Sequence, residues 1–319
     1  MFIKPRLRLA PDQTHFQFMK GRFLGLLVSA VLSTASVVLF FYPGLNLGID
    51  FSGGIVMQVR TVGPADFAQI RAALTEAHIH TQGVQRFGDA SEVLIRLNTQ
   101  PNEQATQQAV SQVRAALEKA APGTRIMRTD AVGASVSAEL FRNGLLALGI
   151  SLLMILAYIW FRFEWQFAVG AVATLILDVT KAIGFLAITR IEFDLVMVAA
   201  ILTVLGYSTN DKVVVYDRVR ENLRKYKTMP LRELIDLSIN ETLNRTLGTS
   251  MTVFLASLPL AIFGAQSISG FATIMLFGIV VGTSSSIFIA APILLFLGEQ
   301  RLRRDAAAPV TKDSPAMEP

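Results

Sequence analysis

Long apolar runs with few charges recur along this chain and are separated by shorter polar segments. The runs are 23–42, 143–161, 165–189, 193–217, 245–264 and 270–298. A helix needs about 20 predominantly apolar residues to cross the hydrocarbon core of a bilayer. The pattern therefore predicts a multi-pass α-helical membrane protein with six transmembrane helices.

A secretory signal peptide is the alternative interpretation of the first run, 23–42. The run is longer than the apolar core of a usual signal, and its small residues, Ser33 to Ser36, lie in its middle instead of at its end. We therefore expect an uncleaved membrane anchor.

The polar segment 43–142 lies between the first two runs and must fold outside the membrane. Its apolar positions alternate between the two-residue period of strands and the helical period. We expect strands at 49–61, 83–87, 92–98 and 124–132, and helices at 64–78 and 101–120. The order β-α-β-β-α-β predicts a small α+β domain of the ferredoxin-like type on the periplasmic side. The domain contains no catalytic motif.

A second polar segment, 218–244, follows the fourth run. Leu231, Leu234, Ile235 and Ile239 recur there at helical spacing between charged residues, which predicts an amphipathic helix at the membrane interface. A plain connecting loop is the alternative. The N-terminal segment 1–22 and the tail 299–319 are also polar, and the composition of the tail predicts disorder.

The composition is typical of a membrane protein, and the distribution of basic residues along the chain indicates its orientation. The chain is 52% hydrophobic and 17% charged, with a mean hydropathy of +0.48 and no cysteine, which excludes disulfides and thiolate metal sites. Lys and Arg gather in 1–22, 218–232 and 301–312. Basic residues in short loops mark the cytoplasmic side, so both termini are predicted to be cytoplasmic. Nucleic-acid binding is not needed to explain the net charge of +5.

Motifs for hydrolytic chemistry are absent from the sequence. It contains no Gly-Lys-Thr phosphate loop, no His-Glu-x-x-His and no cysteine nucleophile. We therefore expect no enzymatic activity, no metal and no cofactor. The chain must take its energy from an ion gradient or from a partner.

Asp211 is the strongest candidate for a functional residue. An ionisable group inside a span costs at least about 2.5–3.5 kcal/mol on insertion scales and usually pairs, meets water or works. Tyr207 and Ser208 precede Asp211 by one turn and flank it on the helix. We interpret Asp211 as a proton relay, with a structural ion pair as the alternative.

Arg245, at the start of the fifth run, could supply the counter-charge. Arginine stays protonated and so cannot carry the proton itself. Thr249 lies one turn further on the same face. The alternative is an arginine that reaches to the interface.

Three further intramembrane charges could pair with one another. Asp178 and Lys181 lie at i and i+3, a spacing that allows a structural pair. Lys212 could pair with Asp217, reach to the interface, or meet Asp178 across helices. In the last run, Gly278 and Gly282 predict close helix packing.

Several motifs resemble the SecD/SecF family of protein-export membrane proteins. The segment 48–54, with Asp50, Phe51, Gly53 and Gly54, is similar to the Gly-x-Asp-Phe-Ser/Thr-Gly-Gly signature of SecF members. The segment 206–211, with Gly206, Tyr207, Asn210 and Asp211, is the most specific. Further similarity lies at 162–165, 198–203, 213–222 and 241–247.

The resemblance implies a SecD partner with a similar six-helix half and a core like that of resistance-nodulation-division (RND) transporters. It implies work with the SecYEG channel, the SecA motor and YajC on a translocating polypeptide, driven by protons as the coupling ion. By resemblance, Asp211 and Arg245 serve proton transport, with Thr249 beside them.

The sequence departs from the family pattern at two positions. Many members have His where this chain has Leu177, and Thr where it has Lys212. A histidine role in the third span therefore does not carry over. Two other functions stay open: half of an RND-type exporter of small molecules or lipids, and a passive scaffold whose charges only pair helices.

Overall fold

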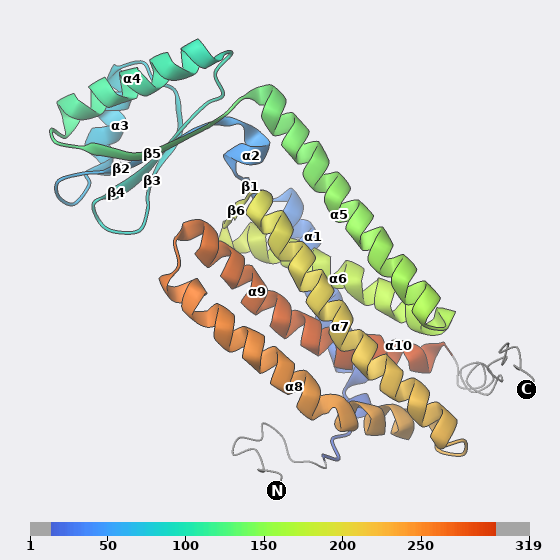
Figure 1. Ribbon diagram of the computed structural model, residues 1–319. Coiled ribbons are helices and arrows are strands. Elements are labelled where there is room, and N and C mark those ends of the chain that lie inside the picture. Colours follow the sequence, from blue (N-terminus) through green and yellow to red (C-terminus); the bar gives the residue numbers. More distant parts are fainter. Residues whose placement is uncertain (1–13, 298–319) are drawn as a thin grey trace, which may run out of the picture.

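The computed structural model describes residues 14–297 and consists of a helical bundle with an α+β domain at one end (Figure 1). Residues 1–13 and 298–319 lie outside the described residues, so most of the predicted N-terminal segment 1–22 and all of the predicted tail 299–319 are not described. Within the described part of the chain, six helices are long and apolar enough to cross a membrane. They are α1 (Arg22–Phe41), α5 (Ala134–Arg162), α6 (Trp165–Thr189), α7 (Leu195–Lys225), α8 (Leu231–Phe263) and the run Ser267–Phe296.

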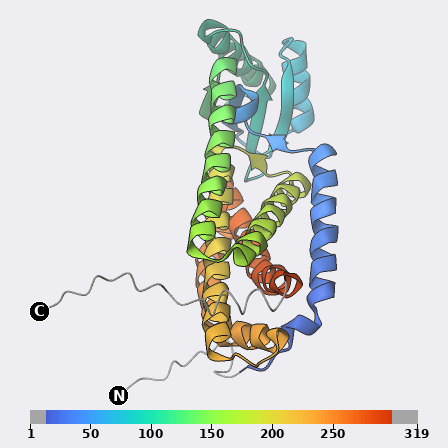
Figure 2. The same cartoon turned by 90° about the vertical axis from the view of Figure 1, so that its right-hand side faces the viewer.

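The last of these runs has three parts. It begins as α9 (Gln266–Ser285), passes through a π-helical stretch, η2 (Ser286–Ala290), and ends as α10 (Ala291–Phe296). A short 3₁₀ turn, η1 (Phe18–Lys20), precedes α1. The helix ends away from the α+β domain, near Arg22, Arg162 and Lys225, are called the basal end below (Figure 2).

The α+β domain has the predicted β-α-β-β-α-β order. Its elements are β2 (Gly54–Arg60), α3 (Phe67–Glu76), β3 (Thr81–Arg86), β4 (Glu92–Leu97), α4 (Glu103–Ala120) and β5 (Arg125–Val132). The antiparallel sheet has the order β3-β4-β2-β5, the ferredoxin-like arrangement. Both helices cover one face of the sheet (Figure 1). Because side chains alternate along a strand, Ile55, Met57 and Val59 point into one core with Ile70 and Leu74.

The first predicted strand, 49–61, is wrong at its start. Ile49–Ser52 forms the short helix α2, and β2 begins only at Gly54. Gly53 and Gly54 separate the two elements with φ angles of 68° and 121°, which residues with a Cβ rarely adopt. Apolar alternation predicts a strand, but it does not reveal this change of backbone conformation.

Two polar segments turn out to be continuations of membrane helices. Helix α7 runs to Lys225 and α8 begins at Leu231, so the loop predicted at 218–244 shrinks to 226–230. The helix expected in that segment is present, but it is the start of α8, and Figure 2 shows its first turns lying across the basal end. Helix α5 likewise begins at Ala134, inside the segment assigned to the domain. Charged residues outside the bilayer do not interrupt a helix, so charge alone misplaces its ends.

The α+β domain is joined to the bundle by the segment around the two glycines. Strand β1 (Asn46–Leu47) pairs in parallel with β6 (Glu192–Phe193), and the Gly48 amide donates to the Phe193 carbonyl at 2.9 Å. Phe51 packs against Phe141 and Phe193, with ring centroids 5.5 and 5.3 Å away.

Two polar contacts strengthen this joint. The Leu195 amide donates to Asp50 Oδ2 at 3.1 Å, so the segment caps the first turn of α7. Arg96 on β4 forms an ion pair with Glu192 on β6. The joint therefore connects the α+β domain directly to the helix that carries Asp211.

Candidate functional site

Asp178 is the centre of a buried polar cluster between α6, α7 and α9. Its Oδ2 atom accepts hydrogen bonds from Lys212 Nζ at 3.0 Å, Ser208 Oγ at 2.8 Å and Ser285 Oγ at 2.8 Å. Lys181 Nζ lies 3.8 Å from the other carboxylate oxygen. All five residues are at most 5% exposed. We call them the Asp178 cluster.

The structure decides between the pairings that the sequence left open for Lys212. Its ammonium group binds Asp178 across helices and also donates to Ser285 Oγ at 3.1 Å. Asp217 instead accepts from Arg162 at 2.9 Å. The expected i,i+3 pair of Asp178 and Lys181 is present, but the contact from Lys212 is shorter.

Asp211 is buried beside this cluster but has different surroundings. It is 6% exposed, and its side chain faces Thr246 of α8 and Ser286 of η2, with the charge of Lys212 nearby. Its Oδ2 atom makes no hydrogen bond to any of the described residues. The carboxylate is therefore buried with fewer partners than a charged group needs.

The two residues expected to flank Asp211 face other partners. Tyr207 donates from its hydroxyl to Ser250 Oγ at 2.9 Å, and Ser250 exchanges a 2.9 Å hydrogen bond with Thr283. Ser208 belongs to the Asp178 cluster. These contacts form a polar layer that connects α7, α8 and α9.

Sequence reasoning missed the serine and threonine members of this layer. Ser285, Ser286, Thr246 and Ser250 are at most 8% exposed. The sequence signal for this layer is the presence of Ser or Thr in each of the neighbouring apolar runs. Such residues are equally typical of ordinary helix packing, so they do not by themselves indicate a functional site. The packing prediction itself is confirmed, because a Cβ at Gly282 would lie 3.0 Å from Ser208 Cβ.

The π-helical stretch η2 begins at Ser286, directly after Ser285. A π-turn shifts the side chains that follow it around the helix axis, and such turns are frequent at functional sites. Here the irregularity lies where one serine faces Asp178 and the next faces Asp211. The two carboxylates are thus served by adjacent residues of one helix.

Arg245 and Thr249 share a face of α8, as predicted, but it is not the face toward Asp211. Both side chains are exposed, and Thr249 Oγ1 donates to the Arg245 carbonyl at 3.1 Å. Among the described residues Arg245 has no ion pair. Gly206 and Asn210 of α7 are exposed as well. These motif residues therefore line an open face of this single chain.

A cleft of about 840 Å³ lies between the helix bundle and the face of the sheet that α3 and α4 do not cover. The end of the bundle next to this cleft is called the upper end below. Asp50, Glu192, Asp194 and Arg190 line it. Asp194 lies just outside the α7 span and caps it by accepting from the Met197 amide at 2.9 Å. Burial raises the pKa of Asp194 above its ordinary value, and the charge of Asp50 raises it further.

Within residues 14–297, no group of three or more His, Cys, Asp or Glu side chains could hold a metal ion. Among the described residues, the buried charged side chains of the bundle are Asp178, Lys181, Asp211 and Lys212. Serine and threonine hydroxyls face the two carboxylates. Such a set can hold, exchange or move protons.

Two family models match the sequence. The model of the protein export membrane protein SecD/SecF C-terminal region matches residues 112–300, and the SecD/SecF GG motif matches residues 38–65. The second match covers the joint built around Gly53 and Gly54.

Curated relatives match over nearly their whole length. Protein translocase subunit SecF of Cereibacter sphaeroides is 43% identical over 303 residues, which are 93% of this chain and 94% of the relative. Protein translocase subunit SecF of Rickettsia akari is 41% identical over 296 residues, covering 92% of this chain and 96% of the relative.

Solved structures support the same relationship. SecDF from Thermus thermophilus, a translocon-associated membrane protein, superposes with a TM-score of 0.82 at 30% identity over 92% of this chain. SecDF in the super-membrane-facing form gives 0.65 at 29% identity over 95%. This chain spans only 40% and 41% of the length of those proteins. Together, the matched motifs, relatives and fold show that the chain belongs to the SecF family of protein translocase subunits.

Proposed function

We propose that this chain assists protein export across the bacterial inner membrane. It forms one half of a complex in which SecD is the other half, and the proton motive force drives the complex. A proton reaches Asp211, and neutralising this carboxylate changes how α7 packs on its neighbours. Arg245 and Thr249 complete the pathway on α8. The observation that carries the proposal is that Asp211 is buried, has no ion pair among the described residues and has one oxygen without a hydrogen bond.

The energy and the mechanical connection are both adequate for such a role. One elementary charge that crosses 100 mV supplies roughly 2.3 kcal/mol. Asp211 lies about 24 Å along α7 from Leu195, at a rise of 1.5 Å per residue. Asp50 caps that first turn, so a shift of α7 is transmitted to the joint with the α+β domain.

The exposed face of α7 and α8 supports a partner half. Asn210, Arg245 and Thr249 are polar and open along helices long enough to span a membrane. Polar groups in hydrocarbon are unfavourable, so this face calls for a covering helix layer. We assign that layer to SecD, whose own residues bring Arg245 into the pathway.

In the proposed complex, the pair acts with the SecYEG translocon, YajC and the SecA motor on a translocating polypeptide. Protons are the coupling ion, and neither a cofactor nor a nucleic acid takes part. The basal end is cytoplasmic, because Arg22, Arg162 and the basic end of α7 lie there.

The test is export of a model preprotein into proteoliposomes that contain SecYEG, SecA, SecD and this chain, with and without a proton gradient. Asp211→Asn is expected to insert and to bind SecD but to lose the stimulation by the gradient. Glu233→Gln is the matched control, because Glu233 is an exposed carboxylate in the first turn of the neighbouring helix α8.

Full stimulation in Asp211→Asn would contradict the relay assignment. Proton flux through the reconstituted complex that is lost in this variant would exclude the passive-scaffold function. Co-purification separates the remaining alternative, since an RND-type exporter half would bring down an outer-membrane channel in place of SecYEG and SecD.

A further inference from the structure

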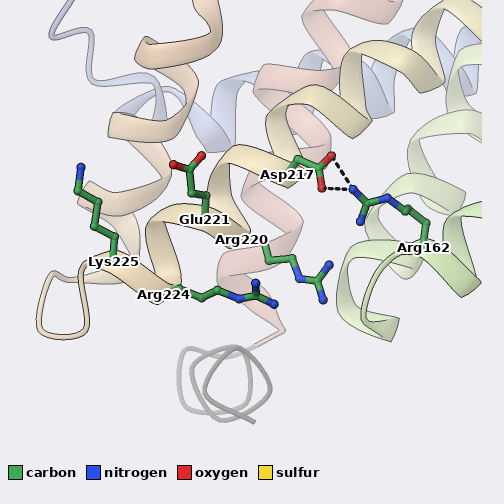
Figure 3. A pocket seen from close by; sticks show the side chains of 6 residues that line it. All are labelled: Arg162, Asp217, Arg220, Glu221, Arg224 and Lys225. Carbon is green, nitrogen blue, oxygen red and sulfur yellow. Dashed lines mark hydrogen bonds and ion pairs between the residues drawn. The ribbon is translucent and has the colours of Figure 1, made fainter. Parts of the chain in front are cut away.

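A second charged site lies at the basal end, outside the polar layer. The site is a pocket of about 510 Å³ between the end of α5 and the last turns of α7. Its lining residues are Arg162, Asp217, Arg220, Glu221, Arg224 and Lys225 (Figure 3). We call it the basal pocket. Four basic and two acidic side chains give it a net charge of +2.

Most of the charges in the basal pocket are already paired. Arg162 binds Asp217 at 2.9 Å, and Arg220 pairs with Glu164 at 3.0 Å. Glu221 pairs with Arg218 at 2.6 Å, outside the pocket lining. Of the six lining residues, Arg224 and Lys225 are the two without an ion pair to any described residue.

Arg224 is the group best placed to bind a ligand. It is exposed and has neither an ion pair nor a hydrogen bond among the described residues. Figure 3 shows its guanidinium group directed toward the same side of α7 as that of Arg220, whereas Lys225 points away. The Lys225 ammonium group lies over the Tyr226 ring at 5.0 Å.

The surface beside the pocket is apolar and aromatic. The last turns of α5 expose Tyr158 by 54%, Trp160 by 59% and Phe161 by 88%, directly before Arg162. Trp165, at the start of α6, is 40% exposed. Aromatic side chains of this kind gather where a membrane helix leaves the hydrocarbon region. The pocket therefore lies at headgroup depth, with an acyl-chain surface next to it.

We propose that the basal pocket binds the phosphate of an anionic phospholipid, with Arg224 as its main ligand and the lipid tails along α5. Arginine presents a planar fork of N–H donors that matches phosphate oxygens. Basic pockets between transmembrane helices at this depth bind anionic lipid headgroups. A soluble anion would make no use of the aromatic surface. The assignment does not depend on the proton pathway.

The test is a titration of the full chain in detergent with phosphatidylglycerol or phosphatidylcholine of equal acyl chains, followed by native mass spectrometry. The wild type is expected to retain phosphatidylglycerol preferentially. Arg224→Glu should weaken that binding by roughly 30-fold, because each unit of charge near an anionic lipid is worth a factor of about five. The milder Arg224→Gln should weaken it about fivefold.

Arg232→Glu is the matched control. Arg232 is an exposed arginine near the start of α8, outside the basal pocket, and its substitution changes the net charge equally. Equal losses in both variants would show a non-specific charge effect and overturn the proposal. Displacement of the lipid by millimolar inorganic phosphate would identify a site for free anions instead.

A photo-crosslinker at position 224 in the assembled complex provides the last check. Crosslinks to lipid support the proposal. Crosslinks to an acidic protein segment would show that a partner subunit occupies the pocket, and would overturn it.

Discussion

Asp178 and Asp211 are two buried carboxylates in one polar layer, yet their surroundings are opposite. Asp178 Oδ2 accepts from one ammonium and two hydroxyl groups. Its other oxygen makes no hydrogen bond to the described residues, but Lys181 Nζ lies 3.8 Å from it as a second cation. Asp211 faces the hydroxyl groups of Thr246 and Ser286, with the charge of Lys212 nearby. Among the described residues it has no ion pair, and one of its oxygens lacks a hydrogen bond.

This difference separates a structural charge from a working one. A buried carboxylate that is paired with cations is held in one state, because removing either partner leaves an uncompensated charge in the interior. A buried carboxylate without an ion pair is poised to change its protonation or to accept a new contact. The two lysines therefore hold Asp178 in place, while Asp211 is left available.

The largest expected effect is that of Asp178→Asn. The change leaves the charges of Lys181 and Lys212 buried without a carboxylate, which should lower the free energy of unfolding by about 3–5 kcal/mol. Thermal unfolding in detergent, followed by the folded fraction on gel filtration, measures it. Adding Lys212→Met should restore much of the loss, whereas simply additive losses would show that the two groups do not depend on each other.

Ser285→Ala should have a smaller effect on the same cluster. It removes one hydrogen bond to Asp178, worth about 1 kcal/mol between membrane helices. The matched control is Ser284→Ala, because Ser284 is exposed and bonds only to the Val281 carbonyl. Equal melting temperatures for the two variants would argue against the role of Ser285 as a hydrogen-bond donor to the carboxylate.

Asp211→Asn should change the free energy of unfolding by less than about 1 kcal/mol, in either direction. An amide of the same shape removes a buried charge that has few partners to lose. The melting assay used for Asp178→Asn gives the direct comparison. A loss as large as that of Asp178→Asn would erase the contrast between the two carboxylates.

The smallest effect concerns a third carboxylate, Asp194, just before α7. Because its pKa is raised in the folded protein, the folded state holds this proton to higher pH than the unfolded state. Its contribution to stability should fall as pH rises from the ordinary value of 3.8 through the folded pKa. Asp194→Asn, which keeps the cap on Met197, should flatten this part of the melting profile.

The control for that profile is Asp66→Asn. Asp66 caps α3 in the same way, by accepting from the Ala68 and Gln69 amides, and lies in an exposed position. An unchanged pH profile in Asp194→Asn would show that burial at the upper end of the bundle does not perturb this group.

The pattern of apolar runs was sufficient to predict the six long helices and the ferredoxin-like domain. Both features can be read from a short stretch of sequence. The thickness of the bilayer sets the length of an apolar run, and the alternation of side chains along a strand sets the two-residue period of the sheet. Four intramembrane charges could also be identified from sequence: Asp178, Lys181, Asp211 and Lys212. An ionisable group in an apolar run is unfavourable in the bilayer, so its presence indicates pairing or a functional role.

Only the tertiary structure decided which of these charges belong together. Lys212 and Asp211 are neighbours in the chain, but they project in different directions around α7, so one meets Asp178 while the other faces Thr246 and Ser286. The helix ends differ from the predicted ones for a related reason. Where a helix stops depends on contacts outside the bilayer, such as the hydrogen bond that Asn222 donates to Glu241, and such contacts cannot be read from sequence patterns. Pairing across helices is set by rotation and register, and those exist only once the helices have packed.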